Sequence, residues 1–254
     1  MNLYSIIIGI LAGGLISFLG VFVINRRLAL AADAFSHIAL PGVAVAILLN
    51  INPTVGALFA LLFGTFIIQG IQSKTKLFTE VLIGLTFSLS LAIGLLLLPE
   101  GELESALLGD IASVGFNDFI LGIAISVILF GILIQYFKKF TFLTFSETLA
   151  QVSGVNVNRV NFVLLVGLAL SVALGIKVVG TLLVGSLLII PAAASQIISK
   201  NFKSLLFFSS IFGLFSVAIG MYFGFLFNLH PGPMIILVEG TIFGIAFLIK
   251  QIKG

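Results

Sequence analysis

Long apolar runs follow one another along the chain and are separated by short polar stretches. A helix needs roughly 20 apolar residues to cross the hydrocarbon core of a bilayer, so each run predicts a membrane-spanning helix. Turn-forming residues mark several of the breaks, such as "NINP" at 50–53 and "PEGE" at 99–102. The pattern predicts nine spans, near 3–24, 33–49, 54–72, 79–98, 116–137, 160–176, 178–198, 205–227 and 233–250.

The composition agrees with this pattern. The chain is 60% hydrophobic and 8% charged, whereas a soluble domain carries about 25% charged residues. A transmembrane β-barrel would instead show alternating segments of about ten residues. The predicted fold is all-α: a polytopic helical membrane protein with eight or nine transmembrane helices, in a single domain over residues 1–254.

The helix count depends on the region from 160 to 198, because only Lys177 interrupts this apolar run. Two spans that meet outside the membrane would give nine helices. One long bent element followed by a half-helix would give fewer full spans. The sequence leaves both arrangements open.

The basic residues predict the orientation, since eleven of the twelve fall on one side of the nine-span arrangement. They are Arg26, Arg27, Lys74, Lys76, Lys138, Lys139, Arg159, Lys200, Lys203, Lys250 and Lys253. Loops rich in lysine and arginine stay in the cytoplasm, so a multi-pass protein of the cell membrane is expected, with the N-terminus outside and the C-terminus cytoplasmic. The outward loop then holds the acidic residues Glu100, Glu102, Glu104 and Asp110.

The chain carries no Walker A sequence, and its longest segment outside the predicted spans runs only from about 138 to 159. The sequence therefore predicts no ATP site and no enzyme activity, and any ATP-driven role requires a separate ATPase subunit. No permanently bound cofactor and no nucleic-acid partner are expected; the surface is expected to contact membrane lipid.

The stretch "AADAFSHIALPG" (31–42) places an aspartate and a histidine inside an apolar run. Asp33 and His37 are four residues apart and share one face of a helix. Ionisable groups in a bilayer are costly and are functional candidates by default. A carboxylate oxygen with an imidazole nitrogen suits zinc or manganese, and a two-fold dimer would supply four such ligands. A capping or hydrogen-bonded pair at a helix start is the alternative.

The same stretch belongs to a longer segment, "RRLALAADAFSHIALPGVAVAILL" (26–49), that resembles the permeases of ABC importers for zinc and manganese (the ZnuB/TroC-like family). A second segment, "KVVGTLLVGSLLIIPAAAS" (177–195), is similar to another hallmark of this family. Weaker matches are "LLGDIASVGFNDF" (107–119), "TLAQVSGVNVNRV" (148–160) and "HPGPMIILVEG" (230–240). The five matches occur in the family's order and span almost the whole chain.

The resemblance implies an ABC importer permease that works as a homodimer with two ATPase subunits and an extracytoplasmic metal-binding protein. It implies that Asp33 and His37 coordinate the transported metal, and that ATP binds only to the partner subunit. It also implies that the cytoplasmic segment "FSETLAQVSGVNVNRV" (145–160) couples the permease to the ATPase. Glu147, Ala150 and Gly154 are the expected coupling residues.

Three further residues are candidates for the pathway or for selectivity. Lys177 either extends to the outer interface, repels cations or pairs with an acid; zinc-type members of the family tend to have a basic residue here and manganese-type members a glutamine, which favours zinc. Glu239 lies in the last span and is a candidate pathway residue. His230, in an outward loop, either contacts the incoming metal or its binding protein, or has no role.

Rival functions remain at this stage. A manganese or iron importer permease would use similar ligand chemistry. A stand-alone secondary cation transporter would explain Asp33 and His37 but not the coupling segment. A membrane scaffold without transport activity would explain neither feature.

Overall fold

The computed structural model describes residues 2–75, 77–98, 107–109, 111, 114–181 and 183–253. These residues form helices and connecting turns and contain no strand, which confirms the all-α prediction. The helices are α1 (Leu3–Asn25), α2 (Ala29–Ile38), α3 (Leu40–Leu48), α4 (Pro53–Lys74), α5 (Thr79–Leu97), α7 (Phe116–Phe145), α8 (Glu147–Val152), α9 (Val157–Val179), α10 (Val184–Ile198), α11 (Phe202–Phe227) and α12 (Pro231–Lys253). Lys76 and the acidic loop residues Glu100, Glu102, Glu104 and Asp110 lie outside the described residues.

Each of the nine predicted apolar runs corresponds to helix in the structure. Eight stretches of the described residues are long and apolar enough to cross a membrane, and α2 with α3 together make one of them (Ala29–Leu48). The ninth run forms α10, which has only 15 residues. The protein is therefore a multi-pass helical membrane protein with eight long spans and one short apolar helix.

Several predicted boundaries were too narrow, and two of them differ most from the structure. The second span begins at Ala29 rather than at 33, and α7 continues to Phe145 instead of ending at 137. Lys138 and Lys139 therefore belong to α7 and not to a loop. Lysine is a good helix former, so a helix that has crossed the membrane can continue through it into water.

The structure decides between the two arrangements left open around Lys177: a long helix that includes Lys177 is followed by a short one, so the break placed at 177 came too early. Helix α9 includes Lys177 in its last turn and ends at Gly180, whose φ of +86° is accessible to glycine at little cost. A full-length helix is thus followed by the short α10. The charge of Lys177 suggested where α9 ends, but the helix ends instead at Gly180, which can adopt a positive φ.

The span Ala29–Leu48 is bent in its middle. Helices α2 and α3 meet at Ala39, and Pro41 is the second residue of α3. A proline ring conflicts with the carbonyl group four residues earlier, here that of His37, and removes one helical hydrogen bond. The bend therefore lies directly after the turn that carries Asp33 and His37.

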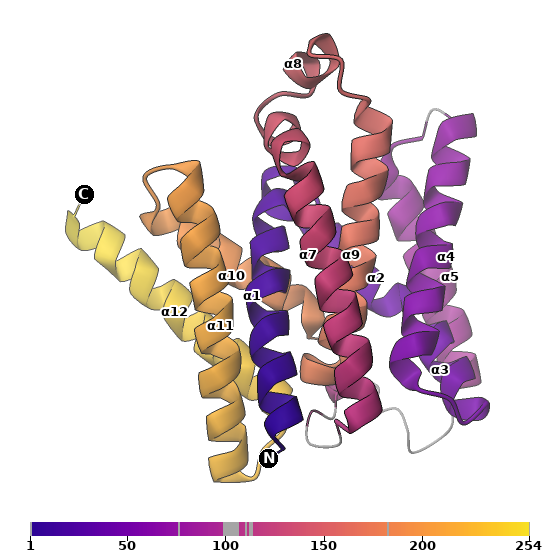
Figure 1. Ribbon diagram of the computed structural model, residues 1–254, viewed down its shortest axis with the longest axis vertical. Coiled ribbons are helices and arrows are strands. Elements are labelled where there is room, and N and C mark those ends of the chain that lie inside the picture. Colours follow the sequence, from indigo (N-terminus) through magenta and orange to yellow (C-terminus); the bar gives the residue numbers. More distant parts are fainter. Residues whose placement is uncertain are drawn as a thin grey trace.

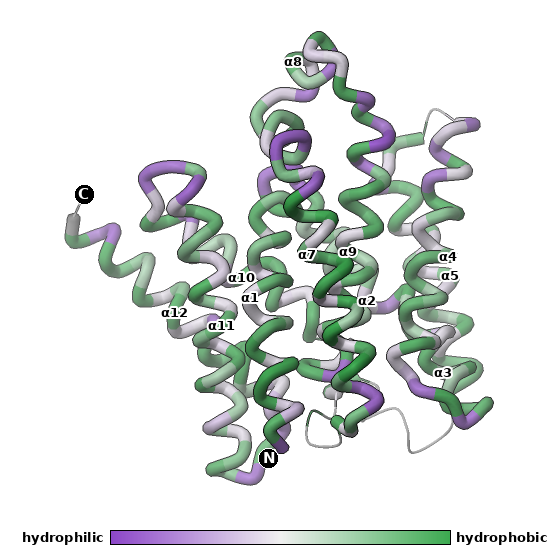
Figure 2. Tube along the Cα trace, viewed as in Figure 1, coloured by the Kyte–Doolittle hydropathy of each residue, from purple (hydrophilic) through white to green (hydrophobic). Residues whose placement is uncertain are grey.

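The helices form three groups (Figure 1). Helices α1, α7 and α9 lie between α10, α11 and α12 on one side and α3, α4 and α5 on the other. Helix α8 projects beyond the others at one end of the molecule. Figure 2 shows that hydrophobic residues dominate the lengths of the long helices, while hydrophilic residues gather mostly near their ends. Of the eight long spans, α9 is the most buried and α5 the least.

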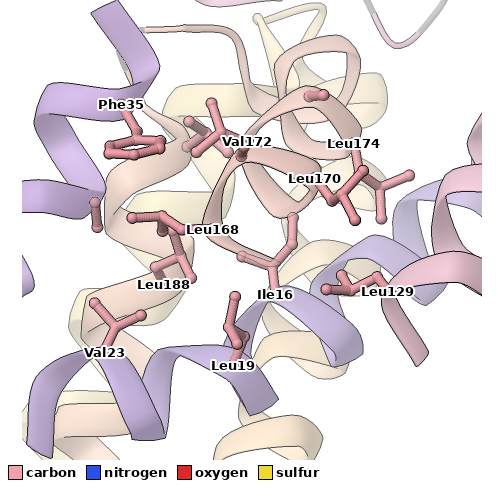
Figure 3. Close-up of a cluster of buried hydrophobic side chains, with 14 of the residues drawn as sticks. Ile16, Leu19, Val23, Phe35, Leu129, Leu168, Leu170, Val172, Leu174 and Leu188 are labelled. Atoms are coloured by element: carbon pink, nitrogen blue, oxygen red, sulfur yellow. The ribbon is translucent and has the colours of Figure 1, made fainter. Parts of the chain in front are cut away.

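A single apolar cluster fills the centre of the bundle. Figure 3 shows side chains from five helices meeting there, α1, α2, α7, α9 and α10. The residues labelled are Ile16, Leu19, Val23, Phe35, Leu129, Leu168, Leu170, Val172, Leu174 and Leu188. Small residues allow the backbones to approach closely: a Cβ atom at Gly20 of α1 would overlap the Leu188 carbonyl group of α10.

Candidate functional site

The Asp33 carboxylate lines an open pocket between α2 and α5. The pocket has a volume of about 450 Å³, and its lining includes two other charged residues, Arg27 and Glu80. Asp33 itself is exposed. The apolar part of the wall comes from residues of both helices, including Ile83 and Phe87. A carboxylate in this position can meet an ion that enters the pocket.

His37 lies one turn further along α2 and is half-buried. Its ring packs edge-on against Phe87, with ring centroids 5.3 Å apart and an interplanar angle of 66°. The Nδ1 atom is buried and has no hydrogen-bond partner. Such an atom lowers stability unless something else satisfies it. Because Phe87 also lines the pocket, the His37 ring lies beside the wall of the space that Asp33 borders.

The position of Asp33 argues against the capping alternative. The N-cap of α2 is Leu28, which makes no side-chain capping bond, and Asp33 lies inside the helix. The Ser36 hydroxyl donates to the backbone carbonyl group of Asp33 and not to its side-chain carboxylate. The side chains of Asp33 and His37 are thus not used to begin the helix.

The first turn of α10 lies against the backbone of Asp33. A Cβ atom built on Gly185 would be 3.2 Å from the Asp33 Cα and 3.4 Å from its Oδ1. A glycine at this position therefore leaves room for the aspartate between α2 and α10. The sequence analysis did not identify Gly185, because only the packing of the two helices reveals its neighbour.

The ligand set within one chain is small. In the part of the chain that the structure describes, no group of three or more His, Cys, Asp or Glu side chains is arranged to hold a metal ion. Asp33 and His37 contribute two donors at most. A metal ion at this turn would need further ligands besides these two side chains.

The expected coupling segment contains a short helix between two turns. Helix α8 starts at Ser146, whose hydroxyl accepts a hydrogen bond from the Leu149 N–H at 3.2 Å. It ends at Val152, and the second residue beyond it, Gly154, has a φ of +77°, while the Val155 N–H donates to the Ala150 carbonyl group at 3.0 Å. This pattern is a Schellman-type helix end, in which the residue with positive φ is usually glycine.

The side chains of α8 divide into an inner and an outer set. Ala150 is fully buried, whereas Leu149 and Val152 are 63% and 83% exposed. Glu147 lies in the first turn and forms an ion pair with Arg26 at 3.3 Å. Ala150 therefore fixes the helix to the bundle, and Leu149 and Val152 form an exposed apolar face at the projecting end of the molecule.

Lys177 pairs with an acid. Its Nζ is 3.8 Å from the Asp118 carboxylate, and its side chain is 24% exposed. Asp118 also accepts a hydrogen bond from the Asn52 amide and one from the Gly115 N–H at 3.1 Å. The pair thus connects the start of α4, the start of α7 and the end of α9.

Glu239 and His230 lie apart from the pocket. Glu239 is fully buried on α12, and neither of its carboxylate oxygens has a hydrogen-bond partner. His230 is exposed and directly precedes α12. Neither residue, nor Lys177, is among the described residues that line the α2–α5 pocket.

The whole chain, and not only this site, has known relatives. Residues 2–250 match the ABC 3 transport family. The protein belongs to this family. It is 32% identical over 249 residues to the manganese import system permease protein ScaB of Streptococcus gordonii, covering 96% of this chain and 88% of the relative. It is 29% identical to the high-affinity zinc uptake system membrane protein ZnuB of Haemophilus influenzae, covering 97% of each.

A solved structure agrees with the fold of this ABC 3 family chain. The structure of PsaBC from Streptococcus pneumoniae in complex with Fab matches with a TM-score of 0.85 and 30% identity, covering 97% of this chain and 92% of that chain. The resemblance to zinc and manganese permeases stated from the sequence is therefore confirmed at the level of the family.

Sequence reasoning did not identify the partners in two polar contacts of this ABC 3 family protein, although pairing of Lys177 with an acid was one of the alternatives. One is the Asp118–Lys177 pair, and the other joins Arg26 to Glu147. Asp118 did have a local sign, since it follows Gly115 by three residues at a helix start and accepts a hydrogen bond from the Gly115 N–H, which is half of a capping box. The partners are far apart in sequence, so neither pairing follows from spacing.

Gly154 gives a prediction for the coupling segment. A non-glycine residue in the left-handed region costs about 1–2 kcal/mol, and the φ of Gly154 is +77°. Nothing lies within 4 Å of a Cβ built there, so the strain is purely conformational. Gly154→Leu is expected to distort the end of α8 and to weaken co-purification of the ATPase subunit.

The matched control is Gly131→Leu, because Gly131 lies inside α7 with open space around its Cβ position. This variant is expected to keep the ATPase subunit. If Gly154→Leu retains both its partner and full transport, the coupling segment lies elsewhere, with 196–204 as the next candidate.

Proposed function

We propose that this chain is the permease subunit of an ATP-driven importer of divalent metal ions, with zinc as the substrate. The observation that carries the proposal is the Asp33–His37 turn: an exposed carboxylate on a pocket and, beside it, an imidazole with an unpartnered buried nitrogen. Carboxylate oxygen and imidazole nitrogen are ligands that zinc accepts. The family match and the permease names of the relatives support the same function.

The proposed path runs between two copies of the chain. Two Asp33 and two His37 side chains would give four ligands, the number that zinc prefers in a tetrahedral site. Helix α5 is the least buried of the long spans, and it forms one wall of the pocket that Asp33 lines. A second copy packed near α2 and α5 would bring the two half-sites together.

The proposed energy source is a pair of separate ATPase subunits bound at the α8 end, which faces the cytoplasm in this proposal. The N-terminus lies at the opposite end from α8 (Figure 1), on the side where an extracytoplasmic metal-binding protein would deliver the ion. The two ends open in turn as the ATPases close and separate, so the ion passes in one direction. The chain contributes the path and the ligands but no ATP-binding sequence.

Manganese is the second candidate substrate. The donor set and the basic residue Lys177 favour zinc, whereas the manganese import permease ScaB is among the relatives. Carboxylate ligands also suit manganese. The test is ATP-dependent uptake by the complete complex reconstituted in vesicles, with labelled zinc against excess manganese and the reverse. Preferred uptake of zinc supports the proposal. Preferred uptake of manganese would mean that manganese, and not zinc, is the substrate. No ATP-dependent uptake of either ion would reject the proposed function.

Metal binding to the permease itself is expected to depend on Asp33 and on pH. Ligands must lose their protons to bind a metal, so acidification from neutral pH is expected to weaken zinc binding to the detergent-purified protein. Removal of a residue that only hydrogen-bonds to a metal ligand already lowers metal affinity by about 10–100-fold. Asp33→Asn removes a ligand itself and is expected to cost at least as much.

The control is Asp118→Asn, which removes a carboxylate charge at the pair with Lys177 and not at the pocket. This variant is expected to bind zinc with the affinity and pH dependence of the unaltered protein. Equal, pH-independent binding by Asp33→Asn and the unaltered protein would mean that Asp33 is not a ligand.

A further inference from the structure

The guanidinium group of Arg26 joins three helices at the α8 end of the bundle. Nη1 donates to the Leu143 carbonyl group at 3.1 Å, and both Nη atoms lie 3.3 Å from Glu147 Oε2. Nη2 also donates to Asn161 Oδ1 at 3.2 Å. Arg26 thus connects the end of α1 with the last turn of α7, the first turn of α8 and the first turns of α9.

The backbone at Arg26 continues into the helix that carries the candidate ligands. The Arg27 N–H donates to the Ile24 carbonyl group at 2.8 Å, and the Leu28 N–H donates to that of Val23 at 2.9 Å. Helix α2 begins at Ala29, and the Leu28 carbonyl group accepts hydrogen bonds from the Ala31 and Ala32 N–H groups. The end of α1 and the start of α2 are therefore held by consecutive hydrogen bonds, with no flexible linker between Arg26 and α2.

This geometry has a mechanical consequence. An arginine guanidinium is planar and presents its donors in a fixed fork, so partners bound to it keep a fixed arrangement. The Arg26 side chain is 18% exposed and the Glu147 side chain 49% exposed, so water is limited around the arginine but reaches the glutamate. A displacement of α8 moves Glu147, and through Arg26 the α1–α2 turn moves with it.

We propose that Arg26 is the positioning residue that transmits movement of α8 to α2, and so to Asp33 and His37. The inference rests on the proposed function and adds to it the contact by which the ATPase docking helix acts on the metal ligands. Arg26 is not among the described residues that line the Asp33 pocket, and it is not a proposed metal ligand. Its removal is therefore expected to separate ATP hydrolysis from transport rather than to stop both.

The first experiment measures metal transported per ATP hydrolysed by the complete complex in vesicles. Arg26→Gln removes the charge and the fork, and is expected to lower this ratio at least about fivefold, the low end of measured coupling between sites. Co-purification of the ATPase subunit and the rate of hydrolysis are expected to remain. Arg26→Lys keeps the charge without the fork and is expected to give an intermediate ratio.

The second experiment follows the two helices directly and needs no metal. The chain contains no cysteine, so single labels can be placed at Gln151→Cys on α8 and at Leu30→Cys on α2, both at exposed positions. ATP is expected to change the mobility of spin labels at both positions in the unaltered complex. In the Arg26→Gln background the α8 label should still respond to ATP and the α2 label should not.

The control is Lys203→Gln, which removes a basic charge at the start of α11 and is expected to change neither readout. An unchanged transport ratio in Arg26→Gln, or an α2 label that still responds, would overturn the proposal. Loss of the ATPase subunit and of transport in equal proportion would also overturn it, since Arg26 would then only hold the structure together. Absence of ATP-dependent metal uptake by the unaltered complex would reject the proposed function itself, before any variant is compared.

Discussion

Replacing His37 with alanine is expected to abolish metal uptake while the protein still inserts in the membrane and binds its ATPase subunit. The imidazole is the only nitrogen ligand proposed at the pocket. Its buried Nδ1 makes no hydrogen bond in the protein, so the substitution breaks no hydrogen bond of that atom. Uptake by cells that lack other zinc transporters measures the effect. Membrane fractionation and co-purification measure insertion and assembly.

The control for His37→Ala is Ser36→Ala, on the neighbouring residue of α2. The Ser36 side chain is buried, and its hydroxyl bonds only to the Asp33 carbonyl group. This variant disturbs the same turn without removing a proposed ligand and is expected to keep most of the uptake. Normal zinc accumulation in the His37→Ala strain would remove this residue from the ligand set.

Replacing Val152 with aspartate is expected to release the ATPase subunit from the permease. Val152 is 83% exposed on the projecting helix, next to the exposed Leu149. Central residues of an interface can each contribute at least about 2 kcal/mol to binding, and a buried unpaired charge adds its own desolvation cost. Co-purification of the two subunits at fixed concentrations measures the loss.

Ile252→Asp provides the comparison, because Ile252 is 85% exposed near the end of α12. The same charge is introduced there at a helix end that the proposal does not use for docking. Retained ATPase binding in Ile252→Asp and lost binding in Val152→Asp would assign the interface to α8. Equal retention in both variants would remove the apolar face of α8 from the interface.

Much of this fold was predictable because a bilayer imposes a strong pattern on its helices. Each predicted apolar run is helical in the structure, since length and hydrophobicity alone determine which segments can span the membrane. The ends were less predictable. Lys138 and Lys139 suggested the end of a span, but the α7 helix continues beyond them to Phe145.

The candidate ligands were predictable for a different reason. Asp33 and His37 are one helical turn apart, so local geometry alone places them on a common face. Gly154, named from the sequence as a coupling residue, has the positive φ that is typical of glycine at a helix end. The contact of Gly185 with Asp33 and the four hydrogen bonds of Arg26 were not predictable, because they depend on how distant helices pack.

The short helix α10 has a consequence for how the protein enters the membrane during synthesis. Its 15 residues rise about 1.5 Å each, or roughly 22 Å in total, whereas the hydrocarbon core is about 30 Å thick. One end of α10 then lies inside the core and must be shielded by protein, because exposed backbone groups are not tolerated in lipid. Helix α10 is therefore too short to span the core alone, and it packs mainly against α1, α11 and α12. Its first turn lies against Asp33, so the surroundings of Asp33 are expected to be complete only after α11 and α12, which follow α10 in the chain, have been made.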